Sequence, residues 1–320
     1  MKFSVIIPVY NRPEELRELL RSLFKQKDDD LEIVVIEDGS SVTSSHVVGS
    51  FKNALHIQYL IQENTGQGFA RNKGMKNATG DFFVILDSDV ILPVDYLQKL
   101  SEAIKDRQLD AFGGPDAADE DFSALQKAMD FAMTSFWTTG GIRGKMKDLS
   151  NYQARGFNMG VSRKVFETTG GFVDPNQGED IEWSMRIKNA GFRLELVKEA
   201  FVYHKRKNTL KSFAKQAFSF GRNRVNVSRF HKGAIKLVHW LPTAFLLFCL
   251  SIPIFYFLDA LLFKFSACLF MLWSLGVVLS SALQNGSAKV GILSWVTSLS
   301  QLWSYGLGLP FELFKKVIRG

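Results

Sequence analysis

The chain has 320 residues, of which 46% are hydrophobic and 22% are charged, and it contains two cysteines. This composition is too apolar for a disordered chain, and a chain of this length does not need disulfide bonds to hold a fold. The net charge of +7 is concentrated, because residues 203–236 contain ten Lys and Arg residues and no Asp or Glu. Residues 237–311 are almost uncharged, so the chain combines a mildly acidic part, a basic strip and an apolar part.

The first part of the chain alternates between predicted strands and helices. Four stretches have the length of strands. Phe3–Tyr10 and Leu31–Asp38 are continuous apolar runs, which are typical of strands that are buried on both faces, and His56–Glu63 and Asp81–Leu86 are the third and fourth predicted strands. An apolar stripe at helical spacing follows Pro13, and Gly68–Ala78 is a second predicted helix. This alternation predicts an α/β, Rossmann-like fold, with a mainly parallel sheet and helices on both of its faces.

Polar residues follow three of these strands at the point where each strand ends. Tyr10 follows the first strand, Asp38 ends the second, and Asp87, Ser88 and Asp89 follow the fourth. Ligands of such sheets bind beside the carboxyl ends of the strands, where Asp38 could accept hydrogen bonds from a base or a ribose. The spacing of Asp87 and Asp89 directs both carboxylates to one side, which suits Mg²⁺ or Mn²⁺ with a diphosphate. A single motif of this kind is more often a solvated strand end than a ligand site, but three polar clusters at one edge favour a ligand site.

Glycines and cations are concentrated in Asn64–Gly74, directly after the third strand. Gly66 and Gly68 allow a ligand to approach the backbone closely, and a helix that begins near Gly68 points free N–H groups at an anion. Arg71, one turn into this helix, is expected to reach a base or a phosphate. The alternative is an ordinary surface helix with a glycine cap and a solvated arginine.

In this order, the motifs resemble those of family 2 glycosyltransferases of the GT-A fold. The resemblance covers residues 3–205 and continues through Phe157–Gly160, Gly170–Phe172, Gly178–Asp180 and Val202–His204. Several ordered motifs at compatible spacing are far more specific than any one of them. The resemblance implies an inverting sugar transfer from a nucleoside-diphosphate sugar, with Mg²⁺ or Mn²⁺ at the diphosphate.

The resemblance also implies roles for individual residues. The donor-binding residues that it implies are Pro8, Tyr10, Asp38, Asn64, Arg71, Asp87 and Ser88. Asp180 is implied as the general base, with Glu179 and Asn158 on the acceptor side, and Asp89 and His204 are implied as metal ligands. Two plainer interpretations stay open: the Glu-Asp pair complements the dipole of the helix that follows it, and His204 is a partly buried histidine at a strand end.

The chemistry that these residues would perform has two requirements. The leaving diphosphate must be neutralised, which a metal ion at Asp89 does as a Lewis acid. The acceptor hydroxyl must lose a proton, and general-base assistance by a carboxylate such as Asp180 is typically worth ~10²–10⁴-fold. A single in-line displacement inverts the anomeric configuration and needs no nucleophilic carboxylate.

Three apolar stretches follow the basic strip. A membrane-spanning helix needs ~20 consecutive apolar residues, and the candidates are Leu237–Leu258, Ala260–Leu283 and the more polar Val290–Phe311. The alternative is the buried helical core of a soluble domain. The adjacent basic strip predicts an anionic membrane surface as partner rather than a nucleic acid, and a catalytic domain on the cytoplasmic side of the inner (cytoplasmic) membrane. Three crossings would put the basic C-terminus on the other side, so the number of crossings stays open.

We therefore expect a GT-A catalytic domain over residues 1–205, a basic amphipathic segment over 206–236, a membrane region over 237–311 and a basic tail over 312–320. Inside the first of these, an acidic stretch over residues 116–121 is expected to be a solvated loop, and Phe131–Gly144 is a candidate acceptor lid.

The expected function is transfer of a sugar from a nucleotide sugar, with UDP as the expected nucleotide, to a lipid-linked or membrane-proximal acceptor in cell-surface glycan synthesis. One alternative is a membrane scaffold that keeps the fold without turnover. Another is a sugar-1-phosphate nucleotidyltransferase, which would need a glycine-rich loop after the first strand, where this chain has Tyr10-Asn11-Arg12-Pro13.

Overall fold

The structure is a computed structural model that describes residues 1–26, 30–117, 122–139, 152–204 and 209–319. The described residues form two compact units, of which the first contains residues 1–26, 30–117 and 152–204 and the second contains 122–139 and 209–319. The second unit therefore takes in a stretch that lies inside the predicted catalytic segment of residues 1–205. Residues 118–121 of the acidic stretch and residues 140–144 of the candidate lid lie outside the described residues.

The first unit is built on a seven-stranded sheet with the order β3-β2-β1-β4-β8-β6-β9. Four neighbouring strands run parallel, and they are β1 (Phe3–Val9), β2 (Glu32–Asp38), β3 (Ile57–Gln62) and β4 (Phe82–Leu86). β8 (Asn158–Ser162) runs antiparallel to β4 and to β6 (Ala111–Gly113), which is parallel to β9 (Leu194–Leu196). The predicted α/β fold with a mainly parallel sheet is confirmed, and the four predicted strands begin and end within one residue of the observed ones.

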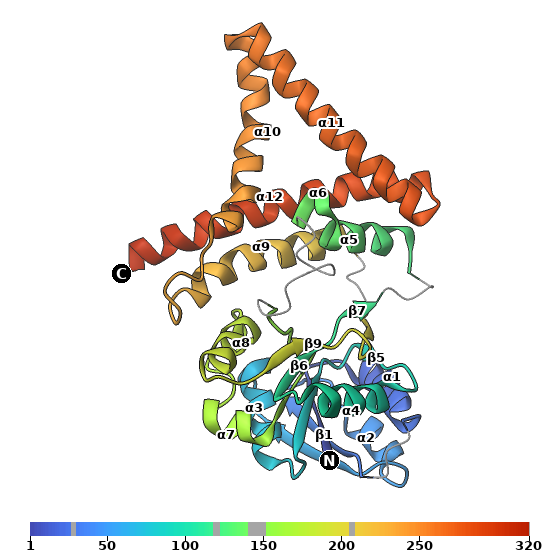
Figure 1. Cartoon of the computed structure of the whole chain (residues 1–320). Helices are drawn as coiled ribbons and strands as arrows, with labels where there is room; N and C mark the ends of the chain where they lie inside the picture. The colour runs from blue at the N-terminus through green and yellow to red at the C-terminus, as the bar shows by residue number, and fades with distance from the viewer. Residues whose placement is uncertain (27–29, 118–121, 140–151, 205–208, 320) are drawn as a thin grey trace. The chain divides into compact units, whose positions relative to one another are not determined.

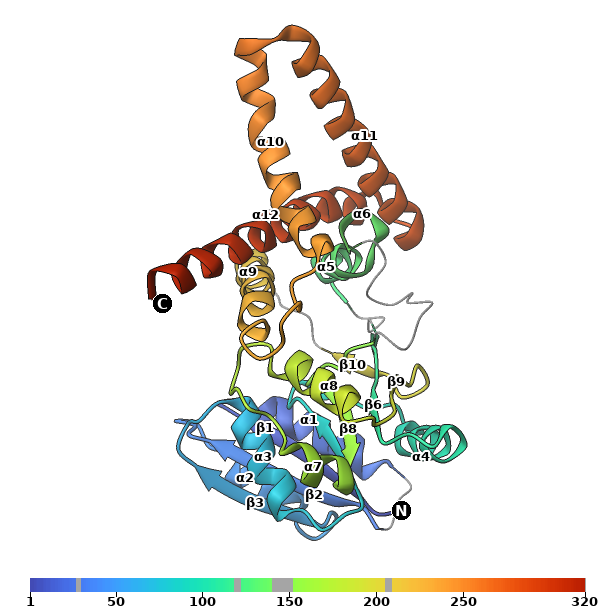
Figure 2. The same ribbon diagram turned by 60° about the vertical axis from the view of Figure 1, so that its left-hand side comes forward.

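Helices cover both faces of this sheet (Figures 1 and 2). One face carries α1 (Pro13–Phe24), α2 (Ser45–Phe51) and α4 (Tyr96–Arg107). The other face carries α3 (Gln67–Asn77), α7 (Arg163–Thr169) and α8 (Glu179–Asn189). Successive side chains of a strand point to opposite faces, so Ile7 joins the first core and Ile6 joins the second. Both faces of β1, β2 and β4 are buried, which is why these strands are continuous apolar runs.

A second, three-stranded sheet lies in the same unit and has the order β5-β10-β7. Its strands are β5 (Val90–Ile91), β10 (Val202–His204) and β7 (Asp116–Ala117). β10 pairs with β5 in antiparallel register, which aligns the backbone of His204 with that of Val90. This pairing ties the end of the first unit to the residue that follows Asp89.

The second unit is helical. Its helices are α5 (Ala124–Thr134), α6 (Phe136–Thr139), α9 (Leu210–Val227), the 3₁₀ helix η2 (Leu237–Trp240), α10 (Leu241–Leu258), α11 (Ala260–Asn285) and α12 (Ala288–Arg319). α12 packs along α9 and α5, and α10 and α11 form a hairpin that projects from α12 (Figures 1 and 2). Asp259 lies at the turn of this hairpin, where its carboxylate accepts the N–H groups of Leu261 and Leu262, both at 2.8 Å.

The contact between α9 and α12 depends on glycine. A Cβ atom at Gly221 or at Gly308 would collide with the backbone of the opposite helix, so both positions need a residue without a side chain.

Phe213 and Val225, on the apolar side of α9, are buried. Protein side chains of the second unit, among them those of α5, therefore cover Phe213. The buried carboxylate of Glu312 on α12 pairs with two arginines from this region, Arg222 at 2.6 Å and Arg229 at 3.3 Å.

Within the described part of the chain, two helices are long and apolar enough to cross a membrane, namely Leu237–Leu258 and Ala260–Asn285. The core helix of a soluble protein would meet the same criteria while being mostly buried, whereas side chains here are exposed, with Phe257 at 83%. α12, the third predicted stretch, is not apolar enough, and its polar side chains are used inside the unit. Ser294 Oγ lies 2.7 Å from Ser281 Oγ, and Thr297 Oγ1 donates to the carbonyl of Ala128 at 2.9 Å.

Candidate active site

The polar residues predicted for one edge of the sheet do lie at one edge. β1, β2 and β4 are parallel, and β1 lies between the other two, so their carboxyl ends share one side. Tyr10, directly after β1, is 53% exposed, whereas Pro8 within β1 and Ser88 after β4 are buried. The edge therefore offers an exposed aromatic ring at its first strand and carboxylates at its second and fourth strands.

Asp38 organises the connection between β3 and α3. The side chain is almost completely buried, and its Oδ1 accepts hydrogen bonds from Gln62 Nε2 at 2.7 Å and from the N–H of Thr65 at 2.9 Å. Oδ2 accepts the N–H of Gly66 at 2.9 Å, and a carboxylate oxygen can accept a second bond. Asn64, which is exposed, donates its side-chain amide to the carbonyl of Asp38 at 3.0 Å. Asp38 can thus hold this loop and still accept a hydrogen bond from a ligand.

Glu37, next to Asp38, is a structural residue of the same edge. Its buried carboxylate accepts the N–H of Ser44 and the hydroxyl of Tyr59, both at 2.7 Å, and it also accepts the hydroxyl of Ser40. Burial, followed by the contact with Glu37, raises the pKa of Tyr59. The acidic residue before Asp38 therefore fixes the loop after β2 through these hydrogen bonds.

The expectation of free N–H groups at the start of α3 is wrong. Besides the two N–H groups that Asp38 accepts, that of Gln67 donates to Asn176 Oδ1 at 3.2 Å and that of Gly68 donates to the carbonyl of Pro175 at 2.8 Å. A Cβ atom at Gly68 would collide with the backbone of Asp174. The loop before α8 therefore covers this helix end, and the glycines permit protein rather than ligand to approach.

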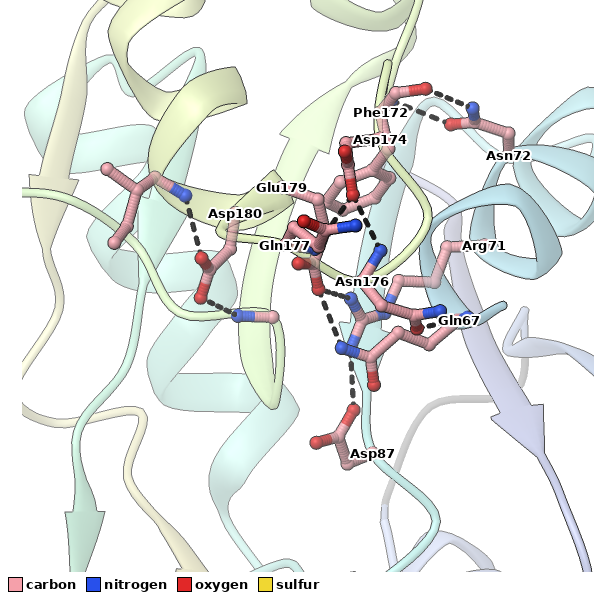
Figure 3. A network of polar contacts seen from close by, with 12 residues as sticks. Gln67, Arg71, Asn72, Asp87, Phe172, Asp174, Asn176, Gln177, Glu179 and Asp180 are labelled. Carbon is pink, nitrogen blue, oxygen red and sulfur yellow. Dashed lines mark hydrogen bonds and ion pairs between the residues drawn. The ribbon is translucent and has the colours of Figure 1, made fainter. Parts of the chain in front are cut away.

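Arg71 is the centre of a buried polar network that links α3, β4 and α8 (Figure 3). Its side chain is 1% exposed, and its guanidinium pairs with Asp87 at 2.7 Å and with Glu179 at 3.3 Å. The guanidinium also lies over the ring of Phe172, 5.3 Å from the ring centroid. Gln67, one turn earlier on α3, donates to Glu179 at 2.6 Å. The predicted contact of Arg71 with a base or phosphate stays a prediction, and the contacts that the structure describes are with these protein groups.

Glu179 and Asp180 lie in the first turn of α8. Their position therefore agrees with the interpretation that the two carboxylates complement the dipole of this helix. Burial, and next the charge of Asp180, raises the pKa of Glu179 to about 7, against the opposing influence of Arg71. Asp180 Oδ1 accepts the N–H of Ile181 at 2.7 Å, and Oδ2 accepts the N–H of Gly156 at 3.2 Å. These contacts orient the carboxylate that the sequence assigns as base.

The raised pKa of Glu179 predicts a pH-dependent stability. Between the ordinary value of 4.5 and about 7, the folded chain binds a proton that the unfolded chain has released. The stabilising contribution of this proton to the free energy of unfolding is fully present below pH 4.5 and is lost as the pH rises through 7. Glu179→Gln removes it, so the melting temperature of the wild type should fall relative to that of the variant between about pH 5 and pH 8. Glu167→Gln, on the exposed side of α7, is the control, and equal pH dependence in wild type and Glu179→Gln would contradict the assignment.

The residues expected at the metal fit a divalent cation that is shared with a diphosphate. Asp87 and Asp89 supply hard carboxylate oxygens, and Asp89 already has a cationic partner, because Oδ2 lies against the guanidinium of Arg12. The backbone of His204 is aligned with the residue after Asp89, but its side chain lies outside what the structure describes. Among the described residues, no three His, Cys, Asp or Glu side chains are gathered to hold a metal. Mg²⁺-type ions are typically held by one or two carboxylates together with substrate phosphates, which agrees with this donor set.

Asn158, expected on the acceptor side, is fully buried at the start of β8. Its Oδ1 accepts the hydroxyl of Tyr96 at 2.6 Å, and its Nδ2 donates to the carbonyl of Ala200 at 2.9 Å. Any influence of Asn158 on an acceptor is therefore indirect, through the packing of β8. The sequence reasoning missed Gln67 and Arg12, which contact Glu179 and Asp89, because no spacing rule connects residues so far apart in the chain.

Comparison with known proteins places this chain in a family. The family described as Glycosyl transferase family 2 matches residues 4–170, just over half of the chain. Glycosyltransferase GlyA of Streptococcus pneumoniae is 39% identical over 110 residues, which are 34% of this chain and 16% of that protein. The uncharacterized glycosyltransferase YibD of Escherichia coli is 36% identical over 107 residues, 33% of this chain and 31% of that protein. TarS of Staphylococcus aureus, a poly(ribitol-phosphate) β-N-acetylglucosaminyltransferase, is 38% identical over 110 residues, 33% of this chain and 18% of that protein.

The mannosyltransferase PcManGT from Pyrobaculum calidifontis, solved in complex with GDP-Man and Mn²⁺, has a similar fold. The superposition has a TM-score of 0.70 at 19% identity and covers 98% of this chain and 88% of that chain. The sheet, its two helical layers and the polar edge thus define a GT-A fold. The chain belongs to glycosyl transferase family 2, although it spans less than a third of the length of the sequence relatives named here.

Proposed function

We propose that the chain is an inverting, metal-dependent glycosyltransferase that uses a nucleoside-diphosphate sugar. Family membership supports the reaction class, and the Arg71 network is the observation that carries the proposal. One buried guanidinium joins Asp87, at the edge of the sheet, to Glu179, the neighbour of the candidate base Asp180. A donor-side carboxylate and the candidate base therefore belong to one rigid framework, as a displacement reaction requires.

In this proposal the residues of the chain have separate tasks. Asp38 accepts a hydrogen bond from the nucleoside, against which the exposed ring of Tyr10 packs. Asp89, with Asp87 and His204, holds Mg²⁺ or Mn²⁺, which supplies charge neutralisation for the leaving diphosphate. Asp180 takes the proton of the acceptor hydroxyl. At the same time, the oxygen of that hydroxyl forms a bond to the anomeric carbon, and the bond between this carbon and the diphosphate breaks. One displacement of this kind inverts the anomeric configuration.

The proposed donor is a UDP-linked sugar, and the proposed product is a glycan of the cell surface. PcManGT was solved in complex with GDP-Man and Mn²⁺, and the name of TarS describes it as an N-acetylglucosaminyltransferase. The bound nucleotide sugar of the first protein and the glycosyl transfer in the name of the second support the donor class without fixing the base or the sugar. A screen that includes UDP-, GDP- and dTDP-sugars decides between them.

We further infer that α10 and α11 cross the membrane as a hairpin, with the catalytic unit on the cytoplasmic side. Two crossings return the chain to the side where it started, which keeps α12 and its basic Lys315 and Lys316 with the basic α9. This topology removes the conflict that three crossings would create. It also places the acceptor at the membrane, as a lipid-linked or membrane-proximal glycan. Carbonate extraction tests the hairpin, because a spanning chain stays in the membrane pellet and a peripheral chain is released.

The function is tested by nucleoside diphosphate release from a panel of nucleotide sugars, with the full chain in its membrane and with Mn²⁺ or Mg²⁺. We expect metal-dependent release with at least one donor, and loss of at least ~10²-fold in Asp89→Ala, because charge neutralisation at the leaving group is lost. A chain that neither binds nor turns over any nucleotide sugar would instead be the membrane scaffold considered above.

A further inference from the structure

One contact at the edge of the sheet has no part in the roles described so far. Nη1 of Arg12, the residue before α1, lies against Oδ2 of Asp89, which is 77 residues further along the chain. The side chain of Arg12 is 40% exposed, whereas that of Asp89 is 13% exposed. The partly exposed guanidinium of Arg12 thus neutralises the mostly buried carboxylate of Asp89, which the proposed function assigns to the metal.

The backbone holds Arg12 in this place from both sides. Asn11 has a left-handed conformation with φ 54°, and its N–H donates to Ser40 Oγ at 2.8 Å while its Oδ1 accepts the N–H of Val42 at 2.9 Å. On the other side, the carbonyl of Arg12 accepts the N–H of Leu16 in the first turn of α1, at 3.1 Å. Only the side chain has to move for the guanidinium to leave its carboxylate partner.

We propose that Arg12 is an internal counter-ion, which competes with the divalent cation for Asp89 and is drawn away when a nucleoside diphosphate binds. This inference rests on the proposed function. A guanidinium beside Asp89 repels a divalent cation, so the metal alone binds weakly. The planar guanidinium is well suited to phosphate oxygens, and a bound diphosphate therefore offers it a new partner.

The consequence is a positive coupling between metal and nucleotide. The diphosphate removes the guanidinium from Asp89 and at the same time supplies further oxygen ligands for the metal. By linkage, the metal must then strengthen nucleotide binding by the same factor. In this way the binding of one ligand prepares the site for the other.

The test is calorimetric titration of Mn²⁺ into the purified full chain, without nucleotide and with saturating UDP. The wild type should bind Mn²⁺ more tightly with UDP than without it. Arg12→Ala should bind Mn²⁺ alone about three- to tenfold more tightly, the range expected for a partly exposed charge, and UDP should then strengthen Mn²⁺ binding by a correspondingly smaller factor. Arg17→Ala is the matched control, because Arg17 lies on α1 with the exposed Glu14 as its partner at 3.0 Å.

The outcomes separate this inference from the function on which it rests. If wild-type binding with UDP depends on Asp89 but Arg12→Ala leaves the affinity for Mn²⁺ alone unchanged or weaker, the role of Arg12 is refuted and the function stands. If the wild type binds no Mn²⁺ with UDP, GDP or dTDP, or if Asp89→Asn binds it equally well, the function itself is refuted. Arg12→Gln removes the charge and keeps a polar side chain, so it should behave like Arg12→Ala and decides the question if the alanine variant is unstable.

Discussion

Asp180→Asn should lower the rate of sugar transfer by ~10²–10⁴-fold, because an amide cannot take the proton of the acceptor hydroxyl. The fold should tolerate the change, since an amide oxygen can still accept the N–H of Ile181 or that of Gly156. The KM for the donor should change little, because the proposal gives Asp180 no contact with the nucleotide. Steady-state release of nucleoside diphosphate in the presence of acceptor measures both quantities.

Two comparisons make this result specific. Glu167→Gln changes an exposed carboxylate on α7 of the same unit and should leave the rate unchanged. Equal melting temperatures of Asp180→Asn and wild type would show that the lower transfer rate comes from the missing base and not from a loss of folded protein. If Asp180→Asn transferred sugar at nearly the wild-type rate, a different residue would be the base.

Arg71→Ala should cause the largest loss of stability among single changes at the site, about 3–5 kcal/mol, because it leaves the buried Glu179 and the partly exposed Asp87 without their shared counter-ion. The side chain is 1% exposed and is the common partner of Asp87 and Glu179. A Cβ atom at Gly156 would lie 2.6 Å from Arg71 Nη1, so the surrounding backbone is shaped around this guanidinium. Arg71→Lys keeps the charge but loses the planar fork that spans two partners, and it should recover only part of the loss.

Urea unfolding of the full chain measures this loss of stability, provided that the spectroscopic probe reports on the unfolding of the first unit. Arg17→Ala removes an ion pair with the exposed Glu14 and should leave the free energy of unfolding almost unchanged, because solvent screens such a pair. Adding Glu179→Gln to Arg71→Ala should restore part of the stability, since it removes one of the carboxylates that has lost its partner. If Arg71→Ala were as stable as Arg17→Ala, the network would not hold the framework together.

The sheet could be predicted from the sequence because burial on both faces leaves a local signal. β1, β2 and β4 are continuous apolar runs, and the polar residue at the end of each run marks the edge where ligands bind. The position of the Glu179-Asp180 pair at the start of α8 could be predicted as well. These features depend on residues that are close together in the chain or on the general geometry of parallel sheets.

The contacts that the sequence did not reveal are those between distant segments. Gln67 and Glu179 are 112 residues apart, and the loop that covers the start of α3 comes from a similar distance. The burial of Phe213 in the second unit likewise depends on partners from α5. A glycine-rich helix start looks the same in sequence whether a phosphate or a neighbouring loop approaches it, and only the fold distinguishes the two cases.

The central claim is that the ends of β1, β2 and β4 bind a metal-bound nucleoside diphosphate beside Asp180. An experimental structure of the full chain with UDP and Mn²⁺ tests it most directly. We expect electron density for the nucleoside near Asp38, for the metal at Asp89 and for the diphosphate between the sheet edge and α8. A nucleotide bound elsewhere on the chain, or a metal ion away from Asp89, would contradict the claim.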